Sequence, residues 1–350
     1  MTATLSTAAT LFAPEDLRLV ERDLGPLAPG MVRIRFGAGG ICGSDLHYFR
    51  HARTGDFVVT SPLILGHEVA GEIVEIAGEA KGLAVGDHVA VNPSRWCGTC
   101  RHCRDGRPNL CDNIYFMGSA SKTPHMQGGF ASLFDAIPAQ CVKVPKELPL
   151  ASAALAEPFA VGLHAVARAG SVEGRHVAPF GAGPIGLLCM LAARLAGADQ
   201  VTMIDIAAAP LAFARALGAD RAVDVAANGA MLAEIAADSP IDVALETSGT
   251  AAGLASAIRT VRRGGTVVQV GNLPGGDMPV PANAIMAKEL DVRGTFRFGE
   301  EFSQAVDLIV SGAVDVGRLI TAHRPLRDAP DAFRLALDRS RSVKVVLTAD

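Results

Sequence analysis

Four cysteines lie within one short stretch of the chain, at the spacing C-x2-C-x2-C-x7-C. They are Cys97, Cys100, Cys103 and Cys111. Four thiolates close a tetrahedral shell around one Zn²⁺ and leave no open position, so a site of this kind is structural. The spacing therefore predicts a structural zinc lobe, which we place at residues 92–113, and by itself it names no reaction.

A second set of metal-ligand residue types lies upstream of the cysteine cluster. It consists of Cys42 and of the neighbouring pair His67 and Glu68. A thiolate, an imidazole and a carboxylate leave an open fourth position, which a catalytic zinc requires. Each residue alone is more often an ordinary core or surface residue. Their joint occurrence ahead of a cysteine cluster and a nucleotide-binding pattern favours a catalytic zinc.

A glycine-rich turn stands between a predicted strand at 177–180 and an apolar helical segment. The turn and the helix start consist of Gly181, Gly183, Pro184, Ile185 and Gly186. Glycines at this spacing permit a tight turn and a close approach of backbone to a pyrophosphate, which the free N–H groups of the helix N-terminus bind. Proline suits the first helical turn, where its missing donor costs nothing. The pattern predicts a dinucleotide site.

Asp205 ends the next predicted strand, at 201–204. A carboxylate at this place accepts hydrogen bonds from the adenosine ribose hydroxyls and repels a 2′-phosphate. The following residues, 206–210, include no Arg or Lys, and Arg215 one helix further on is the cation that would complicate this preference. The sequence therefore predicts NAD, with NADP the less favoured cofactor.

The chain changes character near residue 150. Before it, short apolar runs such as 32–36 and 69–76 alternate with turns, which is typical of β structure. After it, helical runs alternate with six short strands, which is typical of a parallel doubly wound sheet. Pro179 lies in the central strand of that sheet, where a proline removes a ladder donor, so we expect a local irregularity there.

These patterns predict an α/β protein with a β-rich catalytic domain and an inserted dinucleotide-binding domain. The tail ends in a strand-like run at 342–347, which we expect to return to the first domain. The predicted boundaries are 1–153 and 296–350 for the catalytic domain and 154–295 for the dinucleotide-binding domain.

The bulk composition excludes several classes of protein. A chain of 350 residues with 49% hydrophobic residues and a formal charge of −4 gives no reason to expect nucleic acid or an anionic membrane as partner. The longest apolar region, near 185–198, is broken by Arg194 and Gly197, so we expect no membrane span. Seven cysteines, four of them at metal spacing, favour a reducing cytoplasm over a disulfide framework.

Taken together, the motifs resemble those of the zinc-dependent medium-chain dehydrogenase/reductase (alcohol dehydrogenase) superfamily over essentially the full length. They are the stretch 40–47, Gly-His-Glu-x-x-Gly at 66–71, the four cysteines and the glycine turn. The polyol branch, which contains sorbitol and xylitol dehydrogenases, is most similar at 43–48, 157–158 and 162–165. Within it, dehydrogenases of sugar acids are similar at 92–94, 116–120, 124–125, 128–130 and 293–298.

The resemblance implies a GroES-like, partly open β-barrel for the catalytic domain and a Rossmann fold for the other. It makes Cys42 and His67 ligands of the catalytic zinc, and Glu68 a ligand or a group that exchanges with water. Glu157 stands where simple alcohol dehydrogenases carry a second ligating cysteine. In polyol enzymes this glutamate binds zinc or hydrogen-bonds its water, and the sequence leaves the choice between the two glutamates open.

The resemblance also implies the residues that handle the substrate. Ser44 would contact the reacting hydroxyl, His47 would carry its proton towards solvent, and Asp45 would support the zinc ligands. The residues expected to line the substrate pocket are Tyr48, Phe57, Phe116 and Arg297. Members of this branch are often tetramers, so the resemblance implies a homotetramer or a dimer.

The implied reaction is the zinc-dependent oxidation of a secondary alcohol of a sugar acid by NAD. A carboxylate in the substrate needs a cation, for which Arg297 is the first candidate and His125, Arg95 and Arg53 are weaker ones. Polyol enzymes often have Tyr after the pocket arginine, whereas this chain has Phe298. An uncharged polyol such as sorbitol or xylitol is the alternative substrate.

A zinc-ribbon protein that binds nucleic acid is the alternative from another class. The basic residues around the cysteine cluster that would serve it are Arg95, Arg101, His102, Arg104 and Arg107. A nucleic-acid module needs a basic surface, which the chain as a whole does not offer.

Overall fold

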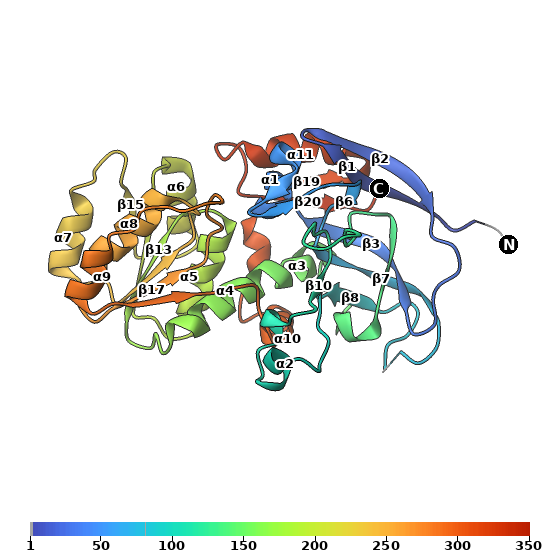
Figure 1. Cartoon of the computed structure of the whole chain (residues 1–350), viewed down its shortest axis with the longest axis horizontal. Coiled ribbons are helices and arrows are strands. Elements are labelled where there is room, and N and C mark those ends of the chain that lie inside the picture. The colour runs from blue at the N-terminus through green and yellow to red at the C-terminus, as the bar shows by residue number, and fades with distance from the viewer. Residues whose placement is uncertain (1–2, 81) are drawn as a thin grey trace. The chain divides into compact units, whose positions relative to one another are not determined.

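The structure is a computed structural model that describes residues 3–80 and 82–350 (Figure 1). The chain forms two compact units. Unit 1 consists of Met1–Glu157 and Phe302–Asp350, and unit 2 consists of Pro158–Glu301. The chain thus leaves unit 1, builds unit 2 and returns, as the strand-like tail predicts.

Unit 1 is built mainly from β-strands. Its largest sheet has the order β12-β8-β7-β3-β20-β19, and β11 also pairs with β3. These strands are β3 (Val32–Gly40), β7 (Glu68–Ile76), β8 (His88–Val91), β11 (Leu133–Ala136), β12 (Cys141–Val144), β19 (Ile320–Pro325) and β20 (Lys344–Thr348). A second sheet has the order β2-β1-β6, with β1 at Leu5–Ala13, β2 at Asp16–Asp23 and β6 at Leu63–Ile64. Two small two-stranded sheets pair β4 (Arg53–Thr54) with β5 (Phe57–Val58) and β9 (Ser94–Arg95) with β10 (Tyr115–Phe116).

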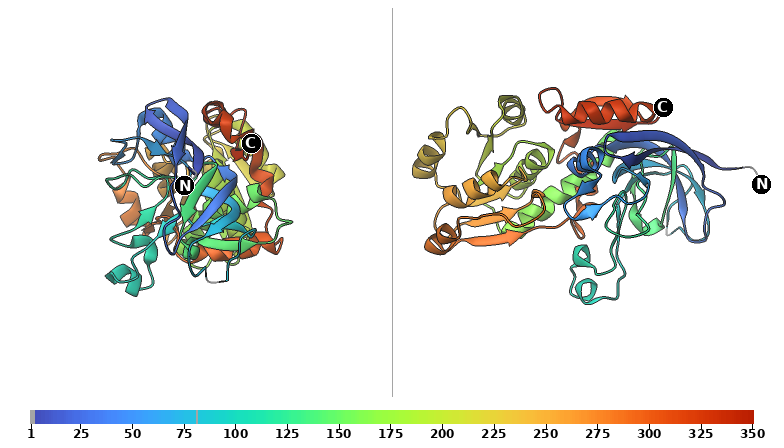
Figure 2. Two further views of the ribbon diagram at one scale, coloured as in Figure 1. Left: turned by 90° about the vertical axis from the view of Figure 1, so that its right-hand side faces the viewer. Right: turned by 45° about the horizontal axis from the view of Figure 1, so that its top comes forward.

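Strand β3 lies at the centre of unit 1, and it is buried along most of its length. Even Arg33 is only 2% exposed, because its guanidinium pairs with Asp135 at 2.8 Å and with Glu75 at 3.0 Å. The tail returns as β20, which runs antiparallel to β3 with Val346 opposite Gly40. Figure 2 shows this red C-terminal segment beside the blue N-terminal strands.

Short helices complete unit 1. They are α1 (Gly43–His51), α2 (Arg101–Arg104), α3 (Leu150–Ala154), α10 (Glu301–Val310) and α11 (Ala329–Leu337), and α4 (Ala156–Ala169) continues into unit 2. The amphipathic α11 buries Phe333, whose ring packs 5.4 Å from that of Phe49 and 6.2 Å from that of Phe130. This aromatic group belongs to the hydrophobic core that also contains Ile34 and Phe36. Burial of such side chains supplies the main driving force for folding of the unit.

Unit 2 is a parallel sheet of six strands in the order β15-β14-β13-β16-β17-β18. The strands are β13 (His176–Phe180), β14 (Gln200–Asp205), β15 (Arg221–Asp224), β16 (Val243–Glu246), β17 (Thr266–Gln269) and β18 (Asp291–Gly294). The helices are α5 (Pro184–Leu195), α6 (Ala208–Ala216), α7 (Met231–Asp238), α8 (Ala251–Thr260) and α9 (Ala282–Lys288). This is the order of a dinucleotide-binding fold, whose ligand crosses the carboxyl ends of the strands where the order reverses. The predicted fold class is confirmed.

Pro179 disturbs the central strand on one side only. Strand β13 pairs with β16 continuously, with Pro179 opposite Leu245. Its pairing with β14 includes His176, Val177 and Phe180 but skips the two residues between Val177 and Phe180. The ladder therefore loses contact with β14 where the proline has no N–H to donate.

One helical stretch of unit 1 and unit 2 is more apolar than the sequence analysis noted. By length and composition the helical stretch Leu150–Ala169 is long and apolar enough to span a membrane, and 61% of its most apolar window is buried inside the protein. It carries Glu157, which is 4% exposed. Core helices of globular proteins pass the same test, and this stretch packs as one of them.

We predict that His176 makes unit 2 less stable in acid. Its Nε2 lies 2.8 Å from Thr202 Oγ1 and its Nδ1 lies 3.0 Å from the Ser239 carbonyl oxygen. Burial lowers the pKa of His176, against the opposing effects of the Ser239 carbonyl and Asp242 and with a smaller lowering by Arg221. Because the folded pKa lies below the unfolded one, this stability is present above about pH 6.5 and is lost as pH falls through the folded pKa.

The measurement is the free energy of unfolding of unit 2 within the whole chain between pH 8 and pH 5. Wild type should lose up to about 1.4 kcal/mol per pH unit more than His176→Gln below about pH 6.5, since one extra proton binds the unfolded state. Equal slopes for the two proteins would contradict this account of His176.

Candidate active site

The residues of the proposed catalytic metal set come together in unit 1. Strand β3 ends where β7 begins, with Gly40 paired to Glu68, so Cys42 just beyond β3 lies beside His67 and Glu68. The ligand atoms of Cys42, His67 and Glu68 all lie within 4.8 Å of one another. His67 is 5% exposed and Glu68 is fully buried. A sheet pairing thus assembles residues that stand far apart in the sequence.

The surroundings of His67 favour positive charge. Asp45 is fully buried, and its Oδ1 lies 3.5 Å from His67 Nδ1 while its Oδ2 accepts a hydrogen bond from Cys42 N at 3.0 Å. Burial opposes the charged imidazole, but Asp45 and Cys42 outweigh it and raise the pKa of His67 well above its ordinary value. A pocket that concentrates a thiol and carboxylates around a buried histidine suits Zn²⁺, and a carboxylate behind the histidine orients it as a ligand.

Lys344 also belongs to this group, although no sequence pattern indicated it. Its Nζ lies 2.7 Å from Glu68 Oε1 and 2.6 Å from Oε2, and it donates to the Ile41 carbonyl oxygen at 2.9 Å. Burial lowers the pKa of Lys344, yet the charges of Glu68 and Cys42 outweigh it and hold that pKa above its ordinary value. A side chain at Gly40 would lie 2.0 Å from Glu68 Oε2, so glycine makes room for the pair.

Glu157, in the first turn of α4, is buried close enough to His67 and Glu68 to feel their charges. Burial raises the pKa of Glu157 to about 7, with a lowering contribution from His67 and a raising one from Glu68. Its carboxylate does not belong to the described group of ligand atoms within 4.8 Å, in which Glu68 stands with Cys42 and His67. Among the described residues, the group of ligand atoms thus consists of Cys42, His67 and Glu68.

The proposed proton carriers lie on α1, directly after Cys42. Ser44 is partly buried and His47 is exposed. Partial burial lowers the pKa of His47, with further lowering by His51 and Arg50. A histidine at the helix surface, one turn from Ser44, has the access to solvent that release of a proton needs.

The residues expected to line the substrate pocket take different positions. The Phe116 ring packs 5.4 Å from the His67 ring. Tyr48 is 3% exposed within the core, and its hydroxyl oxygen accepts from Ala120 N at 3.0 Å. Phe57 is 38% exposed on the β4–β5 hairpin. Of these three, Phe116 is the one in contact with a proposed zinc ligand.

Arg297 lies in unit 2, where it adopts φ +54° and its guanidinium lies 4.8 Å from the centre of the Phe296 ring. The weaker candidates for carboxylate recognition have other contacts. His125 accepts from Thr60 N at 2.8 Å, and its other ring nitrogen lies 2.9 Å from the Lys122 carbonyl oxygen. Arg53 donates to the Gly55 carbonyl oxygen at 3.1 Å, and Arg95 stacks 4.6 Å from the centre of the Tyr115 ring.

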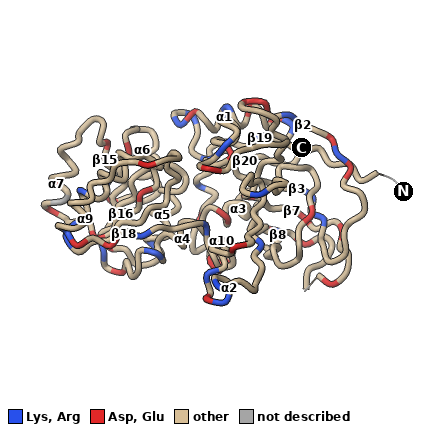
Figure 3. The backbone as a smooth tube through the Cα atoms, viewed as in Figure 1, with Lys and Arg blue, Asp and Glu red and all other residues tan. Residues whose placement is uncertain are grey.

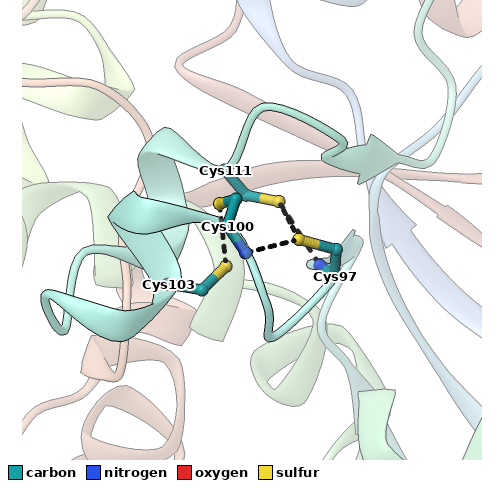
Figure 4. Close-up of side chains that lie close together, drawn as sticks. All are labelled: Cys97, Cys100, Cys103 and Cys111. Carbon is teal, nitrogen blue, oxygen red and sulfur yellow. Dashed lines mark hydrogen bonds between the residues drawn. The ribbon is translucent and has the colours of Figure 1, made fainter.

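The four clustered cysteines form a closed group (Figure 4). Cys97 and Cys111 have their sulfurs 3.4 Å apart, and those of Cys100 and Cys103 are 3.5 Å apart. Zn–S bonds of about 2.3 Å in a tetrahedron give sulfur–sulfur edges of about 3.8 Å, so the group fits zinc. Backbone N–H groups of Thr99 and Cys100 lower the pKa of Cys97 to about 5, which favours the thiolate that a metal needs.

The glycine turn lies between β13 and α5, as predicted. Gly181 has φ +118°, and a Cβ there would lie 2.7 Å from Ser248 N. A Cβ at Gly186 would lie 1.8 Å from the Gly181 carbonyl oxygen. Pro184 opens the helix, and Gly183 caps it with extended backbone. The turn therefore requires glycine and leaves the helix N-terminus available to a phosphate.

Asp205 supports this turn from the end of β14. Its Oδ2 accepts from Ala182 N at 2.7 Å, and its Oδ1 accepts from Ile206 N at 2.7 Å. Arg215 donates to the Ala222 carbonyl oxygen at 2.6 Å, a contact that ties it to β15. The cation that would complicate the preference for NAD is therefore engaged elsewhere.

Together, an open site of thiol, imidazole and carboxylate, a closed four-cysteine lobe and a dinucleotide fold define a zinc-dependent nicotinamide dehydrogenase. Residues 28–146 match the alcohol dehydrogenase GroES-like domain, and residues 184–311 match the zinc-binding dehydrogenase domain. The chain belongs to the polyol branch of the zinc-dependent medium-chain dehydrogenases. The predicted family, its zinc and its nicotinamide cofactor are thereby confirmed.

Three relatives illustrate the similarity. Sorbitol dehydrogenase of Arabidopsis thaliana is 38% identical, with 97% of this chain and 94% of that protein aligned. L-idonate 5-dehydrogenase of Vitis vinifera is 36% identical, over 97% of this chain and 93% of that protein. The crystal structure of L-idonate 5-dehydrogenase from Escherichia coli superposes with a TM-score of 0.93 at 32% identity, covering 99% of each chain.

We predict that Lys344 stabilises the site by compensating the buried charge of Glu68. Lys344→Met should lower the free energy of unfolding by about 3–5 kcal/mol, because it leaves a buried carboxylate without its partner. The double variant Glu68→Gln with Lys344→Met removes both charges and should recover much of that loss. Chemical denaturation measures all three proteins, and additive losses would show that the two side chains do not depend on each other.

The two proposed zinc sites should respond differently to loss of a cysteine. Cys97→Ala should impair folding or assembly, because the lobe loses a ligand of its closed shell. Cys42→Ala should remain folded and bind NADH but should not oxidise the substrate. Circular dichroism, NADH fluorescence and zinc content separate the two cases. A Cys42→Ala protein that retains wild-type turnover would contradict the assignment of the catalytic site.

Proposed function

We propose that this polyol dehydrogenase acts on a sugar acid and converts L-idonate to 5-keto-D-gluconate with NAD. The observation that carries the substrate proposal is Arg297, which the resemblance assigns to the substrate, followed by Phe298 where polyol enzymes often have Tyr; Phe298 is 1% exposed and has no hydroxyl. An arginine offers a carboxylate two parallel charge-assisted hydrogen bonds, whereas the hydroxyl oxygens of an uncharged polyol accept only neutral ones. Relatives named L-idonate 5-dehydrogenase agree with this choice, but sorbitol dehydrogenases are as similar to the chain.

In this proposal Cys42, His67 and Glu68 hold the catalytic zinc. When bound, the zinc acts as a Lewis acid on the reacting hydroxyl, and the nicotinamide accepts the hydride. Asp45 keeps the His67 imidazole oriented, and Lys344 fixes the Glu68 carboxylate. The His67 and Glu68 side chains are thus each held by a buried partner.

The proton of the substrate hydroxyl leaves through α1. Ser44 Oγ accepts it while its own hydroxyl proton moves on towards His47, whose exposed ring releases a proton to solvent. The pKa of Glu157, about 7, lets this carboxyl group take either protonation state near neutral pH. We assign the Glu157 carboxylate to the zinc or to the water beside it.

The dinucleotide site lies in unit 2. We assign the pyrophosphate of the cofactor to Gly181, Gly183 and the helix start at Pro184, and the adenosine ribose to Asp205.

The sequence allows two other functions. A polyol dehydrogenase specific for sorbitol or xylitol remains the second candidate, because relatives with those substrates are equally similar. A nucleic-acid-binding zinc ribbon does not hold, since the chain belongs to a dehydrogenase family. The cations that gather at α2 in Figure 3 also have acidic neighbours, with Arg101 3.4 Å from Asp105 and His102 3.9 Å from Asp112.

We also propose a cytoplasmic homo-oligomer, a tetramer or a dimer. All seven cysteines are free thiols, which suits a reducing compartment. Strand β18 is an edge of the unit 2 sheet, and Val292 on it is 45% exposed. Nearby, Met286 on α9 is 71% exposed and Val280 is 44% exposed. An exposed sheet edge with apolar side chains on and beside it favours pairing with a second copy.

The substrate test is the initial rate of NAD reduction with L-idonate, sorbitol and xylitol. The value of kcat/KM for L-idonate should exceed that for either polyol by about tenfold or more, and Arg297→Ala should lower it by about a hundredfold through loss of the charged hydrogen bonds. The same substitution should change the rates for the polyols only slightly. A clear preference for sorbitol or xylitol would replace the proposed substrate with the alternative.

A further inference from the structure

Glu246 is a fully buried acid that neither the zinc chemistry nor the glycine motif uses. It ends β16, at the carboxyl edge of the unit 2 sheet. In the described part of the chain, its carboxylate accepts hydrogen bonds from N–H and O–H donors and forms no ion pair with a Lys, Arg or His. Burying a carboxylate costs free energy unless such donors satisfy it, so the presence of Glu246 at this edge indicates a functional role.

The donors come from two neighbouring turns. Glu246 Oε1 accepts from Ser248 N at 2.8 Å and from Gly249 N at 3.1 Å, and the Ser248 hydroxyl also donates to it. Glu246 Oε2 accepts from Gln269 Nε2 at 2.7 Å. One oxygen therefore holds the turn that follows β16, and the other holds the end of β17.

The turn that follows β16 packs directly against the glycine turn. Thr247 Oγ1 lies 3.0 Å from the Phe180 carbonyl oxygen and 2.9 Å from that of Gly181, to which it donates. A Cβ at Gly186 would lie 2.8 Å from Thr247 Oγ1. The position of residues 247–249 thus sets the position of the pyrophosphate-binding turn.

The turn that follows β17 is fixed by the same carboxylate. Gly271 N donates to the Glu246 backbone carbonyl oxygen at 2.8 Å, and Gln269 Nε2 also donates to the Gly271 carbonyl oxygen at 2.7 Å. A Cβ at Gly271 would lie 2.9 Å from Glu246 Oε2 and 2.4 Å from Gly249 N. Two turns therefore meet around the Glu246 side chain, and the first of them packs against the glycine turn through Thr247.

We propose that Glu246 is a positioning residue for the nicotinamide dinucleotide. Its carboxylate fixes the spacing of the turns after β13, β16 and β17, which border the crevice where a doubly wound sheet binds its cofactor. The strands β16 and β17 belong to the half of the sheet that does not carry Asp205, so Glu246 acts on the half that receives the nicotinamide. This inference rests on the proposed function of the same site.

The test is the dissociation constant of NADH, measured by fluorescence on the zinc-loaded full chain. In Glu246→Gln the new N–H donor faces either the Ser248 and Gly249 amides or Gln269. The first case displaces the turn after β16, and the second requires the Gln269 amide to flip and lose its bond to the Gly271 carbonyl oxygen. We expect the dissociation constant to rise about tenfold, and KM for NAD to rise more than kcat falls. An unchanged dissociation constant in a folded Glu246→Gln protein would overturn the proposal.

Asp242→Asn is the matched control, because Asp242 precedes the same strand at its opposite end. Its carboxylate accepts from His176 N at 2.8 Å and from Arg262 Nε at 2.6 Å. This variant should lose thermal stability yet bind NADH within about twofold of wild type. A rise in the dissociation constant equal to that of Glu246→Gln would mean that both residues act only through the stability of unit 2.

Gln269→Met keeps the test decisive if Glu246→Gln does not fold. It removes the donor to Glu246 Oε2 and should raise the dissociation constant for NADH about threefold, whereas no change would count against the proposal. A wild-type protein that neither binds NADH nor oxidises the sugar substrates would overturn the proposed function itself. Binding and turnover by wild type with unaltered variants would overturn only the role of Glu246.

Discussion

A buried concentration of acidic groups is the constraint on which unit 1 depends. Asp45 and Glu68 are fully buried and Glu157 nearly so, next to the thiol of Cys42. Such groups are tolerated in a protein interior only beside positive charge or hydrogen-bond donors. Lys344 supplies one cation from the polypeptide, and the zinc of this family supplies the other. The same charges that make the apo site costly give it its affinity for a metal.

The sheet of unit 1 brings these groups together from distant parts of the sequence. Strands β3 and β7 place Cys42 beside Glu68, and the returning β20 places Lys344 against the same carboxylate. Formation of the site therefore requires that the tail complete the sheet. This tail follows unit 2 in the sequence. Unit 2 uses a comparable device, since Asp205 and Glu246 hold backbone N–H groups of the turns at its carboxyl edge.

Much of this arrangement could be predicted from the sequence, because its signals are local. Characteristic spacings mark the four cysteines, the glycine turn and the strand–helix alternation. Pro179 likewise predicts the gap in the β13–β14 ladder. Lys344 could not be found in this way, because it lies 276 residues from Glu68 and a single lysine in a strand has many uses. Glu246 was missed because a glutamate at a strand end is usually exposed. Resemblance placed Tyr48 at the substrate, whereas its hydroxyl is engaged by the backbone of Ala120 in the core.

The most direct test of the central claim is anomalous diffraction at the zinc absorption edge from crystals of the purified protein. The account predicts two zinc peaks per chain. One should be enclosed by the four cysteines of the lobe, and the other should lie about 2.3 Å from Cys42 Sγ, with His67 as a second ligand. A single peak in the lobe, or a second peak away from Cys42 and His67, would contradict a catalytic zinc held by these residues.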